Sequence, residues 1–424
     1  MKKLFCICIL ICLLLTSCGG GQGNLNVYTT SPNEIQVPSE NIDDSALTST
    51  DTDTFETRGE IPEELRVYVP NYTYTPSDDS ADKVTQRTMN SFSVSGDWLY
   101  YVKKESTPRK YNRLMRFNLK TGEISSPCLD PVCTHNTNSC PFQYGYIGNV
   151  RAYGRYVVFA GGSGATSADH IHIYDTETGK IHENVFGGSS GGSGSMYSGC
   201  IGDDAFGTVI IKTENPNATG SDDRTLYDVK IWKYNVPTGK LTEVHSVTST
   251  KNVGGLALLH NGRIFAGDFA AGSDVEIVLS SRFPDGSDVK EHKYFKTVPF
   301  YVGEMMYESS KGNIIAQNMT TGESSTVIYS HGTSTGYTLT NKYIYYYYAF
   351  PVDSDNPKGE KTYELWRSDH SGNNSEKLLT LKQGFSADFI IDGNYLYSYM
   401  AKDGQSYSNV ARLDIETGEV LYIE

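Results

Sequence analysis

The chain repeats one short phrase, and this repetition constrains its fold more than any other feature of the sequence. The phrase is clearest at residues 412–419, where an alternating apolar and polar stretch runs into Thr417-Gly418 and is followed by the apolar residues 420–423. Two β-rich stretches joined by Thr-Gly predict a hairpin whose glycine takes the turn position with φ > 0. Similar phrases occur at residues 116–123, 173–180, 233–240 and, weakened, 317–323. A unit that recurs every ~40–50 residues is typical of a propeller or another repeat array.

A second recurring element, a turn followed by an apolar strand, precedes the hairpins. It occurs at residues 95–102, 153–159, 261–265, 341–345 and 392–397. Pairing these elements with the hairpins gives four-stranded units, whose hairpin glycines are Gly122, Gly179, Gly239, Gly286, Gly322, Gly372 and Gly418. The sequence therefore predicts an all-β propeller of seven four-stranded blades over residues 91–424. The unit at residues 300–331 is the weakest, and six blades is the alternative if that unit is an insertion.

The N-terminus is a targeting segment. Lys2 and Lys3 precede an apolar run at residues 4–15, which is too short to span a bilayer as a mature helix. Residues 15–19 then read Leu-Thr-Ser-Cys-Gly and resemble the bacterial lipobox, in which the cysteine is acylated and becomes the first mature residue. The expectation is a lipoprotein signal peptide at residues 1–17, lipidation of Cys18, and a protein anchored to the cell membrane on its extracytoplasmic side. An ordinary secretory signal with an incidental cysteine is the alternative.

The region after Cys18 lacks the apolar content of a folded domain. Residues 18–64 are rich in Ser, Thr, Asn, Asp, Pro and Gly and predict a disordered tether, because such a segment buries too little surface to offset its ordering entropy. Residues 65–90 read as an extended lead-in, within which residues 65–69 alternate and predict a stray strand on the edge of the domain. The formal net charge of −14 excludes nucleic acid as a partner, since binding it needs a basic surface.

Several blade units resemble a known class of repeat. Residues 365–372, with Trp366, Asp369 and Gly372, and the Leu-Leu-Thr at 378–380 are similar to the blade phrase of TolB-like propellers. They also resemble uncharacterised bacterial lipoproteins that carry the DUF5050-type repeat. The resemblance covers residues 91–424 and implies a ring of blades that serves as a binding platform. Propellers of this kind also host lyases and cap hydrolases, so the resemblance specifies a fold and not a reaction. No α/β-hydrolase domain is expected after the ring.

The most distinctive chemical cluster follows the first hairpin. Cys128, Cys133, His135 and Cys140 lie within thirteen residues and could supply a Cys₃His zinc site, although their spacing is not that of a zinc ribbon or knuckle. The same arrangement recurs in the lipoproteins that the chain resembles. With Cys200 the mature domain has four cysteines besides Cys18, which permits three two-disulfide pairings. Disulfides, a zinc site and reduced thiols are three alternative states of these cysteines. In each state their expected role is to hold an inter-blade loop in place. No other cofactor is indicated.

Other candidate groups give weaker signals. His170 and His172 alternate on a strand and could hold a metal, but no third ligand is identifiable, and the interpretation favoured here is a solvated blade face. The G-x-S-x-G match at residues 187–191 lies in a Gly/Ser run with no helix after it, so it predicts a loop rather than a nucleophile. Residues 343–348 place tyrosines on both faces of a strand; packing explains most of them, and Tyr345 and Tyr347 are candidates to border a binding groove.

These observations together predict a cell-surface lipoprotein whose propeller binds a glycan, peptide or envelope partner without catalysis. The ligand would bind at the mouth of the central channel or on inter-blade loops. A propeller enzyme, such as a polysaccharide lyase or glycan hydrolase with its site at that mouth, is one alternative. A structural component of an envelope complex is another. Convergent side chains with perturbed pKa values at the mouth would favour the enzyme.

Overall fold

The computed structural model describes most of the chain beyond residue 90. The chain divides into residues 1–55 and residues 56–424, and every described residue belongs to the second unit. The described residues are 67–68, 85–86, 91–105, 111–130, 132–133, 140–162, 170–186, 194–219, 224–249, 256–267, 279–296, 298–331, 334–356, 359–382, 384–402 and 409–423. They form strands β1 to β31 and contain no helix, so none of them offers a helix able to cross a bilayer.

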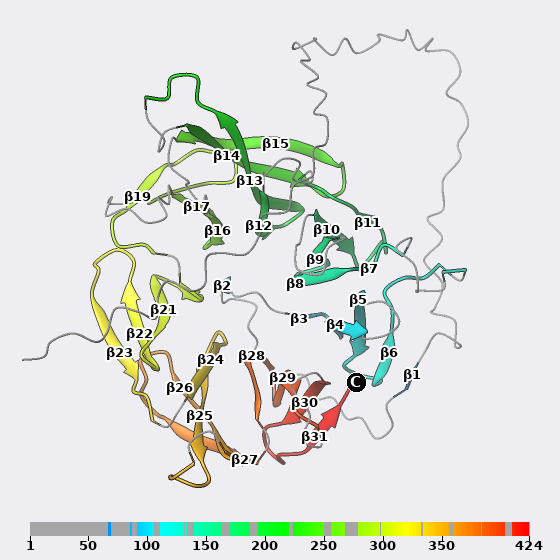
Figure 1. The fold of residues 1–424 in the computed structure, drawn as a ribbon, viewed down its shortest axis with the longest axis vertical. Helices are drawn as coiled ribbons and strands as arrows, with labels where there is room; N and C mark the ends of the chain where they lie inside the picture. Colours follow the sequence, from blue (N-terminus) through cyan, green and yellow to red (C-terminus); the bar gives the residue numbers. More distant parts are fainter. Residues whose placement is uncertain are drawn as a thin grey trace, which may run out of the picture. The chain divides into compact units, whose positions relative to one another are not determined.

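Seven antiparallel sheets, each built around four consecutive strands, follow one another around a ring (Figure 1). Blade 1 comprises β3 (Phe92–Ser95), β4 (Trp98–Glu105), β5 (Tyr111–Asn118) and β6 (Glu123–Ser125). Blade 2 comprises β8 (Tyr146–Tyr153), β9 (Tyr156–Gly162), β10 (His170–Asp175) and β11 (Ile181–His182). Blade 3 comprises β12 (Gly194–Ile201), β13 (Asp204–Glu214), β14 (Thr225–Asn235) and β15 (Lys240–Ser249).

The remaining four blades repeat the same strand order. Blade 4 comprises β16 (Leu256–His260), β17 (Arg263–Gly267), β18 (Leu279–Arg282) and β19 (Lys290–His292). Blade 5 comprises β20 (Phe300–Val302), β21 (Met305–Ser310), β22 (Asn313–Asn318) and β23 (Ser324–Ile328). Blade 6 comprises β24 (Ser334–Leu339), β25 (Tyr343–Pro351), β26 (Lys361–Asp369) and β27 (Glu376–Leu381). Blade 7 comprises β28 (Phe385–Asp392), β29 (Tyr395–Met400), β30 (Asn409–Asp414) and β31 (Val420–Tyr422). The prediction of seven four-stranded blades is confirmed.

The outer hairpin of each blade is shaped by a glycine and, in most blades, by an Asn or Asp at the end of the preceding strand. All seven predicted hairpin glycines have φ between 64° and 87°. In blade 1 the Asn118 Oδ1 atom accepts hydrogen bonds from the backbone N–H groups of Lys120 and Thr121, both at 2.9 Å. Asp414 does the same in blade 7. Asn and Asp side chains stabilise turns in this way, so these residues explain why the phrase recurs.

Apolar side chains fill every junction between neighbouring blades. Seven buried clusters are present in the described residues, one for each junction of the ring. The ring closes where Phe92 and Leu99 of blade 1 pack with Ile390 and Tyr397 of blade 7. The Tyr399 hydroxyl also donates a hydrogen bond to the Val102 carbonyl across this junction, at 3.1 Å.

Strand alternation explains how each blade serves two junctions at once. Successive side chains of a strand point to opposite faces of the sheet. In β25, Tyr345 and Tyr347 pack toward blade 7, whereas Tyr346 and Tyr348 pack toward blade 5. A blade buried on both faces therefore needs large side chains in consecutive positions, which accounts for the tyrosine run.

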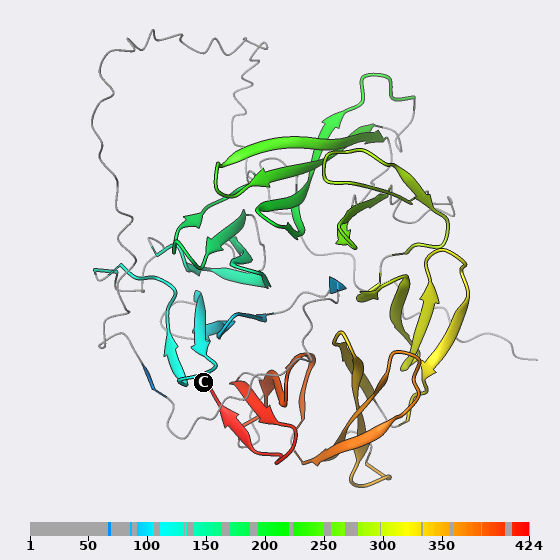
Figure 2. The ribbon, with the colours of Figure 1, turned by 180° about the vertical axis from the view of Figure 1, so that it is seen from behind.

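Two short strands of the lead-in join the propeller at opposite edges. β1 (Val67–Tyr68) pairs with β6 on the outer edge of blade 1, as the alternation at residues 65–69 predicts. β2 (Thr85–Gln86) pairs with β20, the innermost strand of blade 5, and lies near the centre of the ring in both views (Figure 2).

The unit at residues 300–331, expected to be the weakest, forms a complete four-stranded blade in which β21 and β22 have six residues each. The weakened phrase at residues 317–323 keeps its turn, because Asn318 Oδ1 accepts hydrogen bonds from the N–H groups of Thr320 and Thr321.

Candidate metal centre at the junction of blades 1 and 2

The three cysteines of the predicted cluster lie on one excursion of the chain from the edge of β5. β6 pairs with Arg116 and Phe117 of β5, and β7 (Gln143–Tyr144) pairs with Asn112 and Arg113 of the same strand. The chain therefore leaves the sheet after β6 and returns to the same edge with β7. Cys128 and Cys133 lie near the start of this excursion, and Cys140 lies at its end.

Local hydrogen bonds turn the beginning of the excursion back on itself. Asp130 Oδ1 accepts a hydrogen bond from the backbone N–H of Val132 at 3.0 Å, and the Asp130 carbonyl accepts one from the N–H of Cys133 at 3.1 Å. This turn returns Cys133 toward Cys128. At the other end, the Cys140 carbonyl accepts a hydrogen bond from the N–H of Gln143 at 3.1 Å, which ties Cys140 to the start of β7.

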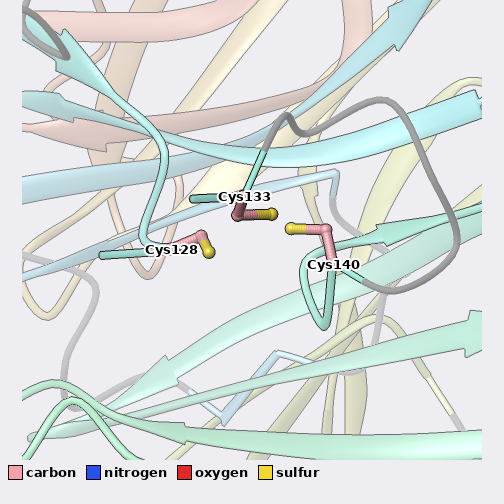
Figure 3. Close-up of side chains that lie close together, drawn as sticks. All are labelled: Cys128, Cys133 and Cys140. Carbon is pink, nitrogen blue, oxygen red and sulfur yellow. The ribbon is translucent and has the colours of Figure 1, made fainter. Parts of the chain in front are cut away.

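The result is a compact group of three sulfur atoms. The Sγ atoms of Cys128, Cys133 and Cys140 all lie within 4.8 Å of one another. Figure 3 shows the sulfurs of Cys133 and Cys140 pointing toward each other, with Cys128 beside them. Among the residues that the structure describes, no His, Asp or Glu joins this group. No disulfide joins any two of the described cysteines in this structure.

The thiol group is part of the core between blades 1 and 2. Cys128 and Cys140 are 5% and 0% exposed, and Cys133 is half-buried beside the same cluster. The hydrogen bond that Cys140 shares with Cys128, together with burial, raises the pKa of the Cys140 thiol. The Cys140 thiol is thus neutral when nothing with a positive charge is bound beside it.

A second set of polar groups lies at the same junction. The Tyr144 hydroxyl lies 3.4 Å from Nδ1 of His172, and the His172 ring stacks on Phe159 with 5.1 Å between centroids. His172 is 2% exposed, and burial lowers its pKa to about 4, with a further contribution from His170. Its Nε2 atom is buried without a hydrogen-bond partner among the described residues. The expectation that both histidines lie on a solvated face is wrong for His172, because blade 1 covers that face of blade 2.

The other predicted thiol and imidazole ligands do not join the cluster. Cys200 packs with the core between blades 2 and 3, so it belongs to a different junction. The fold therefore does not place Cys200 beside the three clustered cysteines, as two disulfides among these four residues would require. His135 and Cys18 lie outside the described residues, as does the Gly/Ser run at residues 187–191, and the expectations for them stay predictions.

Tyr345 and Tyr347 do not border an open groove. They are 2% and 6% exposed and pack with Phe385 and Phe389 between blades 6 and 7. The interpretation of these two rings as binding aromatics is wrong. The neighbouring blade covers their faces, and the alternative explanation by packing holds.

The centre of the ring carries no converging set of perturbed groups among the described residues. Asp388 is the one described carboxyl group whose pKa is raised; desolvation raises it, although the residue is exposed. It lies on β28, the innermost strand of blade 7. The described histidines whose pKa is shifted are all shifted downward, chiefly by burial.

Two features of these sites are absent from the sequence-based predictions. The Asp130 turn could have been found, because Asp-Pro favours turn initiation. The position of β2 inside the ring could not, since a two-residue pairing has no periodic pattern to reveal it.

The fold defines this protein as a member of the seven-bladed propeller class. No family model matches the chain, and no curated protein matches it. Among solved structures, the propeller domain of the trilobed protease from Pyrococcus furiosus is similar, with 11% identity and a TM-score of 0.44 over 81% of this chain and 96% of that one. A prolyl endopeptidase gives 13% identity and a TM-score of 0.49 over 81% of this chain, which spans half of the length of that one. The oligogalacturonate lyase from Vibrio parahaemolyticus gives 11% identity and a TM-score of 0.32 over 82% of this chain and 79% of that one. At these identities the likeness concerns the fold alone.

Proposed function

We propose that this chain is a lipid-anchored, extracytoplasmic propeller that binds a glycan, peptide or envelope partner without turning it over. We also infer a relation to the TolB-like and DUF5050-type lipoproteins, which rests on the blade phrase at residues 365–372. The observation that carries the proposal is the position of β2. In every other blade the innermost strand has no further strand on its inner side among the described residues, but β20 pairs with β2 there.

A strand of the chain itself inside the ring favours binding over catalysis. The inner strands of a propeller line its central channel, where a substrate would enter. β2 covers the inner edge of β20 by antiparallel pairing of Thr85 with Tyr301 and of Gln86 with Phe300. Ligand contact is then left to the rim and the loops, which suits a platform that holds a partner on its surface.

The competing enzyme requires more ionisable groups than the described channel strands offer. Glycoside hydrolysis ordinarily uses two carboxyl groups that flank the scissile bond. On the described inner strands, Asp388 is the one carboxyl with a raised pKa. Asp388→Asn is therefore the variant that separates the two functions.

The test is to incubate the full chain, purified in mild detergent, with envelope glycans, dietary glycans and peptides, and to follow retention and product formation together. We expect saturable retention of at least one class without product, and unchanged retention for Asp388→Asn. Reproducible turnover that disappears in Asp388→Asn would establish the enzyme instead.

The membrane anchor is tested at Cys18, the residue that the lipobox-like stretch at 15–19 marks for acylation. Cys18→Ala is expected to leave unprocessed precursor without lipid label. Cys12→Ala, which changes a cysteine inside the signal, is the matched control and should be processed normally. Unchanged lipid labelling of Cys18→Ala would refute the anchor.

A further inference from the structure

The strongest unassigned feature of the molecule is the sulfur group at the junction of blades 1 and 2. We propose that Cys128, Cys133 and Cys140 bind one Zn²⁺ ion as thiolates, and that this ion fastens the excursion between β6 and β7 to the core. The inference concerns a structural site and does not depend on what the propeller binds.

The geometry fits a zinc ion after small adjustments. Zinc–thiolate bonds are about 2.3 Å long, so sulfurs on a tetrahedral ion lie about 3.8 Å apart. The three Sγ atoms already lie within 4.8 Å of one another, on two loop ends that β5 holds in place. Closing the remaining gap requires shifts of at most about 1 Å, which side-chain rotation supplies.

The number of thiols favours a metal over a disulfide. A disulfide joins two sulfurs and leaves the third as a lone thiol, and Cys200 is not available because it packs at the next junction. A metal ion engages all three sulfurs at once. Burial makes three thiolates costly by themselves, and a divalent cation offsets that charge locally.

The identity of the ion follows from the donors. Thiolates are soft ligands that select Zn²⁺, Cu(I) or iron–sulfur clusters, while carboxylates suit harder ions. No carboxylate belongs to the group among the described residues. Three thiolates leave the fourth position of a tetrahedral zinc ion to a ligand from outside the group, and Cys133, which is half-buried, marks the side from which that ligand would come.

A bound zinc ion would join the two ends of the excursion. Without the ion, the turn at Asp130 and the bond from Gln143 to Cys140 hold the two ends separately. With it, Cys128 and Cys133 on one side are bonded to Cys140 on the other. Metal binding therefore becomes part of the folding free energy of this junction.

The experiment uses the full chain, exported from the cytoplasm of its expression host and purified without reductant or chelator. Metal content is measured by elemental analysis, and each cysteine is read by differential alkylation and mass spectrometry. We expect one zinc per chain, with Cys128, Cys133 and Cys140 protected until a chelator is added. Replacing zinc by Co²⁺ in the unaltered chain should give a thiolate charge-transfer band.

Variants then assign the ligands. Cys128→Ser and Cys140→Ser should lose the metal, while Cys200→Ser, a half-buried thiol outside the group, should keep one zinc per chain. A disulfide between any two of the three cysteines in the unaltered chain overturns the proposal. So do three freely alkylated thiols with no metal, or stoichiometric copper in place of zinc. These readings use the unaltered chain, so a variant that fails to fold does not obscure the answer.

Discussion

The junction of blades 1 and 2 and the junction of blades 6 and 7 solve the same packing problem with different chemistry. Between blades 6 and 7 the buried residues are Tyr, Phe, Leu, Ile, Met and Ala side chains, with Tyr347 against Phe385 at 4.7 Å between ring centroids. Between blades 1 and 2 the core includes Cys128 and Cys140, and His172 stacks on Phe159 beside it. Blades 1 and 7 form the same hairpin turn. The buried thiols and the imidazole are therefore not needed to build a blade.

This contrast indicates which part of a repeat fold could carry a second function. An aromatic junction gains stability from area and contact, and it responds little to pH or metals. The stability of a junction with buried thiols and an imidazole depends on pH and on any metal ion that binds there. Substitutions, metal and pH should therefore affect the two junctions differently.

The largest effect is expected from Tyr347→Ala at the aromatic junction. Removing a buried aromatic side chain leaves a cavity and costs about 3–5 kcal/mol of unfolding free energy. Tyr347 is 6% exposed and lies against Phe385, so the site has little freedom to collapse. Urea unfolding should show a lower midpoint with an unchanged slope.

Tyr329→Ala is the matched control, because Tyr329 is 65% exposed and its loss should change the free energy by no more than about 0.5 kcal/mol. The loss in Tyr347→Ala should be the same with and without chelator. A loss below about 1 kcal/mol would mean that this junction is not closely packed.

The next effect is the response of the blade 1–blade 2 junction to metal. If the three thiols bind zinc, free ion at a hundred times its Kd stabilises the fold by about 2.7 kcal/mol, and a chelator removes that amount. The chain with Tyr347→Ala should lose the same increment, because the buried clusters of the two junctions share no residue. Cys128→Ser should show no response. A chelator effect that persists in Cys128→Ser would locate the metal elsewhere.

A smaller effect is expected from protons on His172. Its pKa is about 4 in the folded chain against 6.5 for the free side chain, because burial disfavours the charged form. The unfolded chain therefore binds more protons between these values. The contribution is complete above about pH 6.5 and is lost as pH falls toward 4. Between pH 7 and pH 5 the loss is about 2 kcal/mol.

The measurement compares unfolding of the unaltered chain and His172→Gln at several pH values, with chelator present so that thiolate protonation does not contribute. The difference between the two chains isolates His172 from the other buried histidines, such as His260 at the junction of blades 4 and 5. Equal pH dependence in both chains would show that His172 titrates normally.

The contrast between the junctions also explains what the sequence reveals and what it hides. The blade number follows from local signals, because glycines such as Gly122 and Gly418 must take φ > 0 wherever the hairpin recurs. The closeness of Cys128, Cys133 and Cys140 follows from their short spacing. The burial of His172 and Tyr347 does not follow, since alternation indicates a face of a strand but not which neighbouring blade covers it. The separation of Cys200 likewise depends on which junction its strand serves.

The smallest effect tests whether the blades are alike apart from their junctions. Asn118 in blade 1 and Asp414 in blade 7 each accept two backbone hydrogen bonds at the outer hairpin, at 2.9 Å for Asn118 and at 2.9 and 3.0 Å for Asp414. Replacing either residue by Ala removes the acceptor and should cost about 1 kcal/mol, because net hydrogen-bond contributions are of this size. Asp414→Asn keeps an acceptor at the same place and should lose much less.

Equal losses for Asn118→Ala and Asp414→Ala, measured by urea unfolding, would mean that the hairpin is a uniform unit of the repeat. The chemical difference between the two regions would then reside in the junctions, where side chains face a neighbouring blade. A loss for Asn118→Ala that exceeds that for Asp414→Ala by more than about 1 kcal/mol would contradict this. The hairpin of blade 1 would then be coupled to the thiol excursion that follows it, since β6 ends at Ser125, shortly before Cys128. Repeating the pair of measurements with chelator decides this, because coupling through the excursion must weaken when the ion is removed.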